Sequence, residues 1–222
     1  TYIKIKNIKY IKMSSQDIMD LPKLVVMGES GVGKTCLIDR FIGKDFNSNT
    51  QATQCQSYIT KTIKIPEIGK SITINIWDTV GQEKYRSFAR IFYKDAKMAI
   101  LVYDITRKNT FNEMKDWWYK DIKEHGDPNI IIGIAGNQSD RYIEEHVQEQ
   151  EGKKFAESVG AAFRLTSAQN CNGINELFKD VGRKYLELSN QNIKSNQKIK
   201  IGEKDADGKQ EKQRNKKKHC FK

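Results

Sequence analysis

The sequence predicts an α/β fold in which helices cover both faces of a mostly parallel β-sheet. Short apolar runs alternate along the chain with segments whose apolar residues recur at helical spacing, the pattern of parallel strands joined by crossover helices. The 222 residues, 37% of them hydrophobic, are enough for one well-packed domain. Ligands of such sheets bind beyond the carboxyl ends of the strands, so a functional site is expected there.

Six short segments carry the strand pattern: residues 24–27, 58–65, 71–77, 99–103, 130–135 and 162–165. The second and third alternate apolar and polar residues, and the PEIGK sequence between them favours a hairpin turn through Pro66 and Gly69. Residues 99–103 form a continuous apolar run, as expected of a buried strand.

Helical segments lie between these strands. One is expected to begin with an N-cap at Asn109 or Thr110 and to stop at HGDP, another to end at Gly160. Trp117 and Trp118 are interpreted as helix packing. The apolar faces comprise Leu37, Ile38, Phe41 and Ile42 in the first helix, Phe111, Met114, Trp118 and Ile122 in the second, and Ile174, Leu177, Phe178, Val181 and Tyr185 in the last.

The formal net charge of +11 comes from the two ends of the chain. Residues 1–12 contribute +4 and residues 189–222 contribute +7, which leaves the body neutral. A neutral body argues against a nucleic-acid-binding face, which needs clustered Lys and Arg. Residues 1–19 are expected to be an N-terminal extension, flexible or foreign to the native protein. Met13 opens an MSSQD start, so residues 1–12 are the part that would be foreign. Residues 20–188 then form the domain, followed by a disordered basic tail over residues 189–222.

The four cysteines are widely spaced, without a CxxC pair or a nearby His arranged as metal ligands, and favour a reducing, cytosolic setting. No apolar run approaches the roughly 18 uninterrupted residues of a membrane span. The N-terminal run alternates Ile with Lys, unlike a signal peptide. The sequence thus predicts neither export nor a membrane span.

Residues 28–35 read GESGVGKT, which fits G-x-x-x-x-G-K-[ST] between a strand and a helix. The glycines let backbone N–H groups turn inward around phosphates, and the helix N-terminus adds partial positive charge. Lys34 is expected to reach the β- and γ-phosphates, and the Thr35 hydroxyl to ligate Mg²⁺. A plain Gly-rich turn is the alternative, which this context disfavours. The remaining nucleotide-binding candidates in this segment are Ser30, Gly31, Val32, Gly33 and Cys36.

Two further motifs follow strands. In WDTVGQE, Asp78 can hold Mg²⁺ through water, Gly81 can offer its N–H to the γ-phosphate, and Gln82 can orient the attacking water. In GNQSD, Asn137 and Asp140 lie at a strand end. The Asp140 carboxylate can accept hydrogen bonds from two guanine N–H groups that adenine does not match, so it is predicted to select the base. Each motif alone could be an ordinary turn.

These motifs in this order, with YRSF at 85–88, IFYKDA at 91–96 and LVYDIT at 101–106, resemble the small GTPases of the Ras superfamily, most closely the Rab proteins. The resemblance covers about residues 20–188. It implies a P-loop small GTPase fold with a six-stranded sheet and one antiparallel edge strand, bound GTP or GDP with Mg²⁺, and slow GTP hydrolysis.

The resemblance also implies further site residues. Phe46 falls where the family packs an aromatic ring on guanine, and Thr53 where a threonine ligates Mg²⁺ and senses the γ-phosphate. TSAQN resembles a guanine-binding loop in which Ser167 and Gln169 flank Ala168, whose N–H contacts the guanine oxygen.

The sequence departs from the family at several positions. Gln138 and Gln169 replace two lysines beside the nucleotide, which is expected to weaken binding by about 1–3 kcal/mol and to speed release. Replacing both glutamines with lysine should then slow nucleotide release. Val80 replaces a usual Ala and is expected to slow hydrolysis or bias the second switch. Gln54 and Cys55 replace an apolar residue and a Gly of the family. The choice of effectors is therefore the property that can least be inferred for this chain from the resemblance.

The resemblance implies an exchange factor, a GTPase-activating protein that supplies an arginine, and effectors that read both switches. Cys220, beside a basic cluster, is predicted to be prenylated, with prenylation machinery and a dissociation inhibitor as further partners. The protein would then be a cytoplasmic monomer, peripheral on the cytosolic face of an endomembrane. CFK is not a C-a-a-X box, so an incidental thiol in a solvated tail is the alternative.

The sequence is compatible with three classes of function. The first is a Rab-like GTPase switch in membrane traffic. The second is a GTP-binding scaffold with little or no hydrolysis, for which absent turnover would be the sign. The third is a nucleic-acid-binding P-loop protein that uses its basic tail, which steeply salt-dependent binding would reveal.

Overall fold

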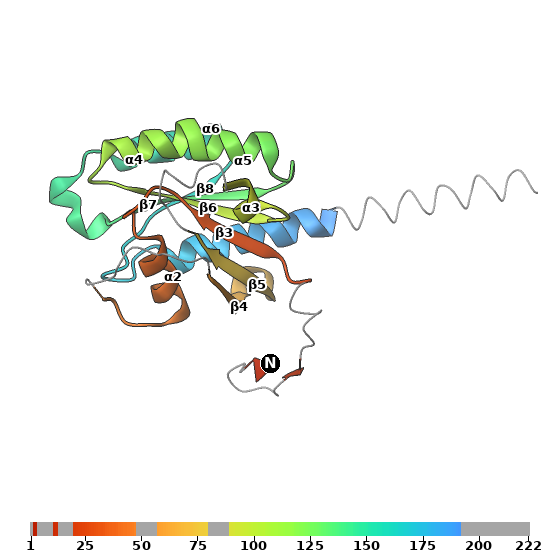
Figure 1. Cartoon of the computed structure of the whole chain (residues 1–222). Helices are drawn as coiled ribbons and strands as arrows, with labels where there is room; N and C mark the ends of the chain where they lie inside the picture. Colours follow the sequence, from red (N-terminus) through yellow and green to blue (C-terminus); the bar gives the residue numbers. More distant parts are fainter. Residues whose placement is uncertain (1, 4–10, 13–19, 48–56, 80–88, 192–222) are drawn as a thin grey trace, which may run out of the picture. The chain divides into compact units, whose positions relative to one another are not determined.

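The structure is a computed structural model that describes residues 20–47, 57–79 and 89–191, together with residues 2–3 and 11–12 (Figure 1). The chain divides into two units, Thr1–Lys184 and Tyr185–Lys222. The first unit holds the sheet and the candidate site. The two short stretches near its start, β1 (Tyr2–Ile3) and β2 (Ile11–Lys12), pair with each other in antiparallel orientation.

Within the described part of the chain, six strands form one sheet in the order β4-β5-β3-β6-β7-β8. They are β3 (Lys23–Met27), β4 (Ser57–Ile65), β5 (Lys70–Asp78), β6 (Met98–Asp104), β7 (Ile131–Asn137) and β8 (Ala162–Leu165). Neighbouring strands are parallel except β4 and β5, which form a hairpin around the short 3₁₀ helix η1 (Pro66–Ile68). The predicted sheet with one antiparallel edge strand is confirmed.

Helices lie on both faces of this sheet, as predicted. The elements are α2 (Lys34–Ile42), α3 (Ala89–Tyr93), α4 (Lys108–Glu113), the π-helical turn η3 (Met114–Tyr119), α5 (Lys120–His125), the 3₁₀ segment η4 (Ser139–Glu144), α6 (Glu149–Ser158) and a helix over residues 174–191. Figure 1 shows α4, α5 and α6 on one side of the sheet and α2 on the other. On the α2 side, the rings of Phe41 and Phe178 stack with centroids 3.8 Å apart, which joins α2 to the last helix.

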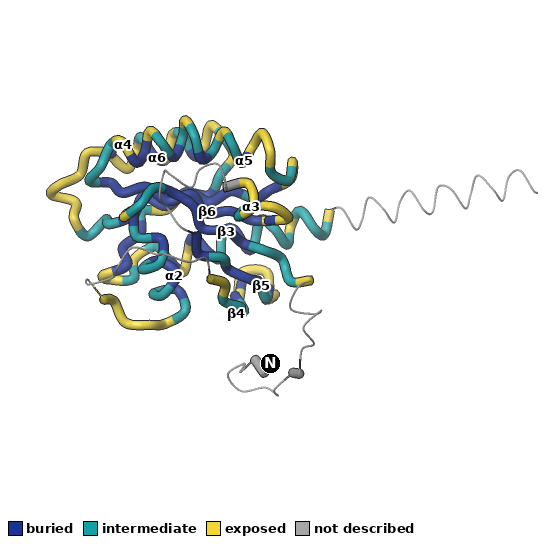
Figure 2. The backbone as a smooth tube through the Cα atoms, in the orientation of Figure 1, coloured by how far each residue is buried: buried dark blue, intermediate teal, exposed yellow. Residues whose placement is uncertain are grey.

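The core lies on both sides of the central strands: β6 is buried along its whole length, and β3 and β7 are buried after their first residue (Figure 2). Successive side chains of a strand point to opposite faces. In β3, Val25 and Met27 therefore join the cluster under α4, α5 and α6, while Leu24 and Val26 are buried as well. A strand buried on both faces needs a continuous apolar run, which is what the sequence shows there.

The helix after β6 differs from the prediction in two ways. It begins at Lys108, after Arg107, and not at Asn109 or Thr110. The Thr110 hydroxyl instead accepts a hydrogen bond from the Asp104 N–H at 3.0 Å and donates to the Arg107 carbonyl at 2.7 Å, so it holds the chain reversal after β6. The helix also contains a π-helical turn, which a pattern of 3.6-residue spacing does not reveal.

Two other expectations can be compared with the structure. Trp118 is 2% exposed and belongs to the core, which confirms its interpretation as helix packing. The last helix continues through residue 191, whereas the sequence places the start of the tail at residue 189. The Ser189 hydroxyl donates to the Tyr185 carbonyl at 2.9 Å, a bond one helical turn back that fits this extension.

Candidate functional site

The predicted site residues gather at the carboxyl ends of the parallel strands. Residues 28–33 connect β3 to α2, which begins with Lys34 and Thr35, and Asp78 is the last residue of β5. Asn137 is the last residue of β7, and residues 166–170 follow β8. Parallel strands bring their carboxyl ends to the same edge, so four segments that are distant in sequence meet there.

The loop over residues 28–35 depends on the backbone freedom of its glycines. Gly28, Gly31 and Gly33 have φ angles of 148°, 72° and 90°, which L side chains rarely adopt. A Cβ on Gly28 would lie 2.2 Å from the Val102 carbonyl oxygen, and one on Gly33 would lie 2.5 Å from Nδ2 of Asn137. The loop therefore packs too closely against β6 and β7 for side chains at these two positions.

Lys34 begins α2, and its side chain folds back across the loop with only 6% exposed. Its Nζ donates to the carbonyl oxygens of Gly28 and Glu29, both at 2.9 Å. Burial lowers the pKa of this amine to about 8, although the carboxylates of Asp78 and Glu29 act to raise it. A buried amine held by backbone carbonyls is well suited to bind an anionic phosphate.

Thr35 and Asp78 form a pair of oxygen donors beside Lys34. The Thr35 hydroxyl donates to Oδ2 of Asp78 at 2.7 Å, while Oδ1 of Asp78 is buried and has no hydrogen-bond partner among the described residues. Burial raises the pKa of Asp78, and the Thr35 hydrogen bond and the Lys34 charge oppose that shift. Hydroxyl and carboxylate oxygens are ligands that Mg²⁺ prefers, so the pair fits a magnesium ion and its water shell.

Asn137 links three segments of the site. Its side chain is 1% exposed, and Nδ2 donates to the Val32 carbonyl of the glycine-rich loop at 2.7 Å. Its Oδ1 accepts from the Thr166 hydroxyl at 3.1 Å. Asn137 thereby fixes the loop after β8 and the phosphate loop to the end of β7.

The two predicted guanine-binding loops also come together. The Ser167 hydroxyl donates to Oδ1 of Asp140 at 2.5 Å, and the Asn170 N–H donates to the Ser167 hydroxyl at 3.3 Å. Ser167 and Ala168 are buried, whereas Gln169 is exposed. The Asp140 carboxylate is therefore oriented by the neighbouring loop, as a base-reading group requires.

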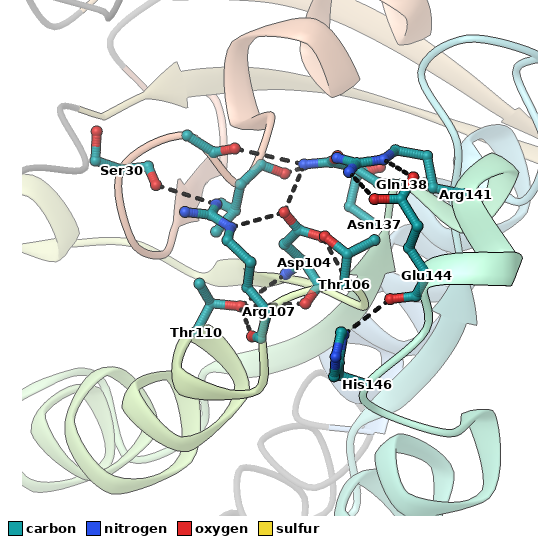
Figure 3. Close-up of polar contacts among 12 residues, drawn as sticks. Ser30, Asp104, Thr106, Arg107, Thr110, Asn137, Gln138, Arg141, Glu144 and His146 are labelled. Atoms are coloured by element: carbon teal, nitrogen blue, oxygen red, sulfur yellow. Dashed lines mark hydrogen bonds and ion pairs between the residues drawn. The ribbon is translucent and has the colours of Figure 1, made fainter.

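One buried carboxylate in the site was not identified from the sequence. Asp104 ends β6 and is 1% exposed. Its Oδ1 accepts from the N–H and hydroxyl of Thr106 at 2.9 and 2.7 Å, and its Oδ2 accepts from Nε of Arg107 and Nε2 of Gln138, both at 2.8 Å (Figure 3). An acidic residue that ends a fully apolar strand is the signal that could have identified it.

Gln138 makes contacts that the sequence did not predict. Besides Asp104, its Nε2 donates to the Gly31 carbonyl at 3.5 Å, and its Oε1 accepts from Nη1 of Arg141 at 2.9 Å. We expected Gln138 to lose both packing and positive charge beside the nucleotide. In the structure Gln138 contacts the phosphate loop through Gly31, and its oxygen accepts from the Arg141 guanidinium. The effect of Gln138 on nucleotide binding and release stays a prediction.

Two more residues support the site without having been predicted to do so. The Thr79 hydroxyl is buried and donates to the Val26 carbonyl at 2.7 Å, which ties the end of β5 to β3. Nε1 of Trp118 donates to the Glu29 carboxylate at 3.0 Å and anchors the phosphate loop to η3. Both residues look like ordinary core residues in the sequence.

The remaining predicted residues are not placed in the site by the structure. Phe46 follows α2 and is 40% exposed, so its packing on a base stays a prediction. Thr53, Gly81, Gln82 and Cys220 lie outside the described residues, as do Gln54, Cys55 and Val80.

Comparisons with known proteins agree with this site. A sequence model of the Ras family matches residues 23–187. The chain is 40% identical to the human Ras-related protein Rab-22A over 163 residues, which cover 73% of this chain and 82% of that protein. It is 38% identical to mouse Ras-related protein Rab-31 over 181 residues, 81% of this chain and 91% of that protein. It is 40% identical to RABA1b of Arabidopsis thaliana over 159 residues, 72% of each.

The fold and the glycine-rich loop together define a P-loop α/β protein, in which this loop, the Thr35–Asp78 pair and the loops that carry Asp140 and Ser167 lie at the carboxyl ends of the parallel strands. More particularly, the chain belongs to the Ras family, as a small GTPase of the Rab type. It binds GTP and GDP, hydrolyses GTP and takes part in vesicular membrane traffic.

Proposed function

We propose that the site binds GTP and GDP as magnesium complexes and that its residues divide the work between phosphates, cation and base. Lys34 and the N–H groups of residues 28–35 bind the phosphates, Thr35 and Asp78 hold Mg²⁺, and Asp140 selects guanine. Bound Mg²⁺ neutralises the negative charge that develops on the phosphate oxygens during transfer.

The observation that supports this proposal most strongly is the buried Oδ1 of Asp78, for which the part of the chain that the structure describes supplies no hydrogen-bond partner. A buried carboxylate oxygen without a partner is destabilising by about 1–3 kcal/mol or more. It lies beside the Thr35 hydroxyl and the Lys34 amine, which are the other groups that a magnesium-bound phosphate needs. A hydrated cation at this position would supply the missing partner.

The hydrolytic step depends on residues outside the described part of the chain. By resemblance, Gln82 orients the attacking water, Gly81 donates its N–H to the γ-phosphate, and Thr53 completes the magnesium site. The sequence assigns no arginine to the transition state, so hydrolysis is expected to be slow until an activating protein supplies one. Membership of the family does not favour the alternative of a scaffold with little or no hydrolysis.

Rab-type GTPases generally work with exchange factors, activating proteins and effectors. We infer that effectors of this chain read both switches and the strands beside them. Tyr58 of β4 lies opposite Trp77 of β5, with the rings stacked at 5.1 Å, and Tyr58 remains 47% exposed. An exposed aromatic side chain on a rigid hairpin suits a protein interface, where such residues are enriched.

We further propose that the C-terminal tail attaches the protein to the cytosolic face of an endomembrane. One lipid on Cys220 together with the basic tail would suffice for stable attachment. This route requires prenylation machinery and a dissociation inhibitor that covers the lipid. Among the described residues, no helix is both long and apolar enough to cross a membrane.

Nucleotide selectivity provides the first test. The full chain is titrated with fluorescent GDP, which is then displaced by GDP or ADP in Mg²⁺ or in EDTA, and phosphate release from GTP is followed separately. We expect GDP to compete at least about a hundredfold better than ADP, and Asp140→Ala to remove this preference. Asp116→Ala, a carboxylate 66% exposed on the surface, is the matched control. Equal competition by ADP, or GTP turnover that is absent with Mg²⁺, would contradict the proposal.

A further inference from the structure

Side-chain hydrogen bonds connect the guanine-binding loop to the phosphate loop (Figure 3). Arg141 donates to Oε1 of Gln138, and Nε2 of Gln138 donates to Oδ2 of Asp104. Nε of Arg107 donates to the same Oδ2, and its Nη2 donates to the Ser30 carbonyl at 3.3 Å. The chain of contacts therefore begins in η4, crosses the end of β6 and ends on the phosphate loop.

The amide of Gln138 is essential to this connection because it both donates and accepts. Its NH₂ group faces Asp104 and the Gly31 carbonyl, and its oxygen faces the Arg141 guanidinium. A lysine ammonium can only donate. Lysine at position 138 could keep the Asp104 contact, but it would place its charge against Arg141 and remove the acceptor.

The guanidinium of Arg107 lies next to Gly31 of the phosphate loop. A Cβ on Gly31 would be 3.5 Å from Nη2 and 3.8 Å from Nη1 of Arg107. Its side chain is 40% exposed, while its partner Asp104 is 2% exposed.

We propose that Arg107 and Arg141 are positioning residues of the nucleotide site, which act through Asp104 and Gln138 to lock the phosphate loop to the guanine-binding loop. The lock slows nucleotide release, because both loops must separate from the ligand before it leaves. Gln138 is then a matched part of this arrangement and not a weakened lysine. This inference rests on the proposed function of the same site.

Release of fluorescent GDP from the full chain in Mg²⁺ tests the lock. We expect release to be about tenfold faster in Arg107→Ala, which loses a charged hydrogen bond to a buried carboxylate, and about threefold faster in Arg141→Ala. Gln138→Lys should accelerate release at least as much as Arg141→Ala. The matched control is Arg164→Ala. Arg164 has a side chain that is 47% exposed and pairs with Asp180 at 2.7 Å, so it resembles Arg107 in exposure. GDP release from this variant should be as fast as from the unaltered chain.

A double-mutant cycle separates positioning from general stability. Because Arg141 acts through the Gln138 oxygen, Arg141→Ala should add no acceleration in the Gln138→Lys background. Amide hydrogen exchange of residues 28–33 should rise in Arg107→Ala, whereas the urea midpoint should fall no more than in Arg164→Ala. An additive double variant would contradict the proposed route through Gln138.

Two results would overturn the inference. One is an unchanged release rate in both arginine variants, and the other is slower release in Gln138→Lys. If instead the proposed nucleotide binding were wrong, the unaltered chain would not retain fluorescent GDP in Mg²⁺. That result would differ from both of these and would be seen before any variant is compared.

Discussion

The phosphate end and the base end of the site are built in different ways. At the phosphate end, positive-φ glycines and a buried lysine bonded to backbone carbonyls shape the loop, and β6 and β7 pack directly against it. At the base end, hydrogen bonds between side chains join three segments, as in the pairs Asp140–Ser167 and Gln138–Asp104. A loop shaped by its backbone allows few substitutions, whereas a side-chain network can be rebuilt with other residues.

The largest expected effect is on a phosphate-loop glycine. Gly28→Ala should lower the free energy of unfolding by more than about 3 kcal/mol, since its Cβ would meet the Val102 carbonyl in addition to the strain of positive φ. Gly43→Ala is the matched control, because φ is +93° there and no atom of the described residues lies within 4 Å of the added Cβ. Its cost should be about 1–2 kcal/mol. Equal urea-denaturation losses for the two variants would show that close packing does not determine this loop.

The next effect concerns the oxygen pair at the cation site. Thr35→Val keeps the shape of the side chain but leaves Oδ2 of Asp78 without its hydroxyl donor. GDP affinity in Mg²⁺ should fall about a hundredfold, equivalent to about 2.7 kcal/mol, because the bound cation would lose the hydroxyl ligand that we propose for it. Thr35→Ser retains the hydroxyl and should remain close to the unaltered chain. If Thr35→Val lowered GDP affinity by a similar factor in EDTA and in Mg²⁺, Thr35 would not act through the cation.

A smaller effect is expected at the base end. Ser167→Ala removes the hydroxyl that orients Asp140, and GDP affinity should fall about five- to tenfold while the preference over ADP persists. Ser158→Ala in α6 is a suitable control, because its hydroxyl donates to the Phe155 carbonyl within the same helix. Competition titrations with GDP and ADP measure both quantities. If Ser167→Ala lowered GDP affinity as much as Thr35→Val, the base end and the phosphate end would be equally sensitive to substitution.

The smallest effect lies outside the site. The Lys97 ammonium and the Asn129 N–H lower the pKa of Asp127 below its ordinary 3.8. A carboxyl with a lowered folded pKa contributes its full stability above its unfolded pKa and loses it as pH falls through the folded value. Asp127→Asn should therefore reduce the free energy of unfolding by less than about 1 kcal/mol at pH 7. In urea titrations this difference should shrink below pH 3.8, whereas a difference that persisted in acid would have another cause.

The contrast between the two ends also explains how far the sequence could be interpreted. The phosphate loop, Asp78 and the six strands were predicted because glycines, a strand-ending carboxylate and apolar runs leave local patterns. Asp104, Arg107 and Arg141 were missed because nothing in their local sequence indicates that they meet. The contacts of Gln138 were missed for the same reason, since the sequence shows the replaced lysine but not that Arg141, three residues later, donates to the Gln138 oxygen.

The sequence by itself determined the fold class, the order of the strands along the chain and the chemistry of the phosphate loop, because each depends on the periodicity or backbone freedom of neighbouring residues. Only the tertiary structure decided which side chains complete the base end. Asp104, Gln138 and Arg141 become partners when the parallel arrangement of β6 and β7 brings their carboxyl ends together. Hydrogen bonds act over about 3 Å in space regardless of sequence separation, so a short local pattern cannot encode them.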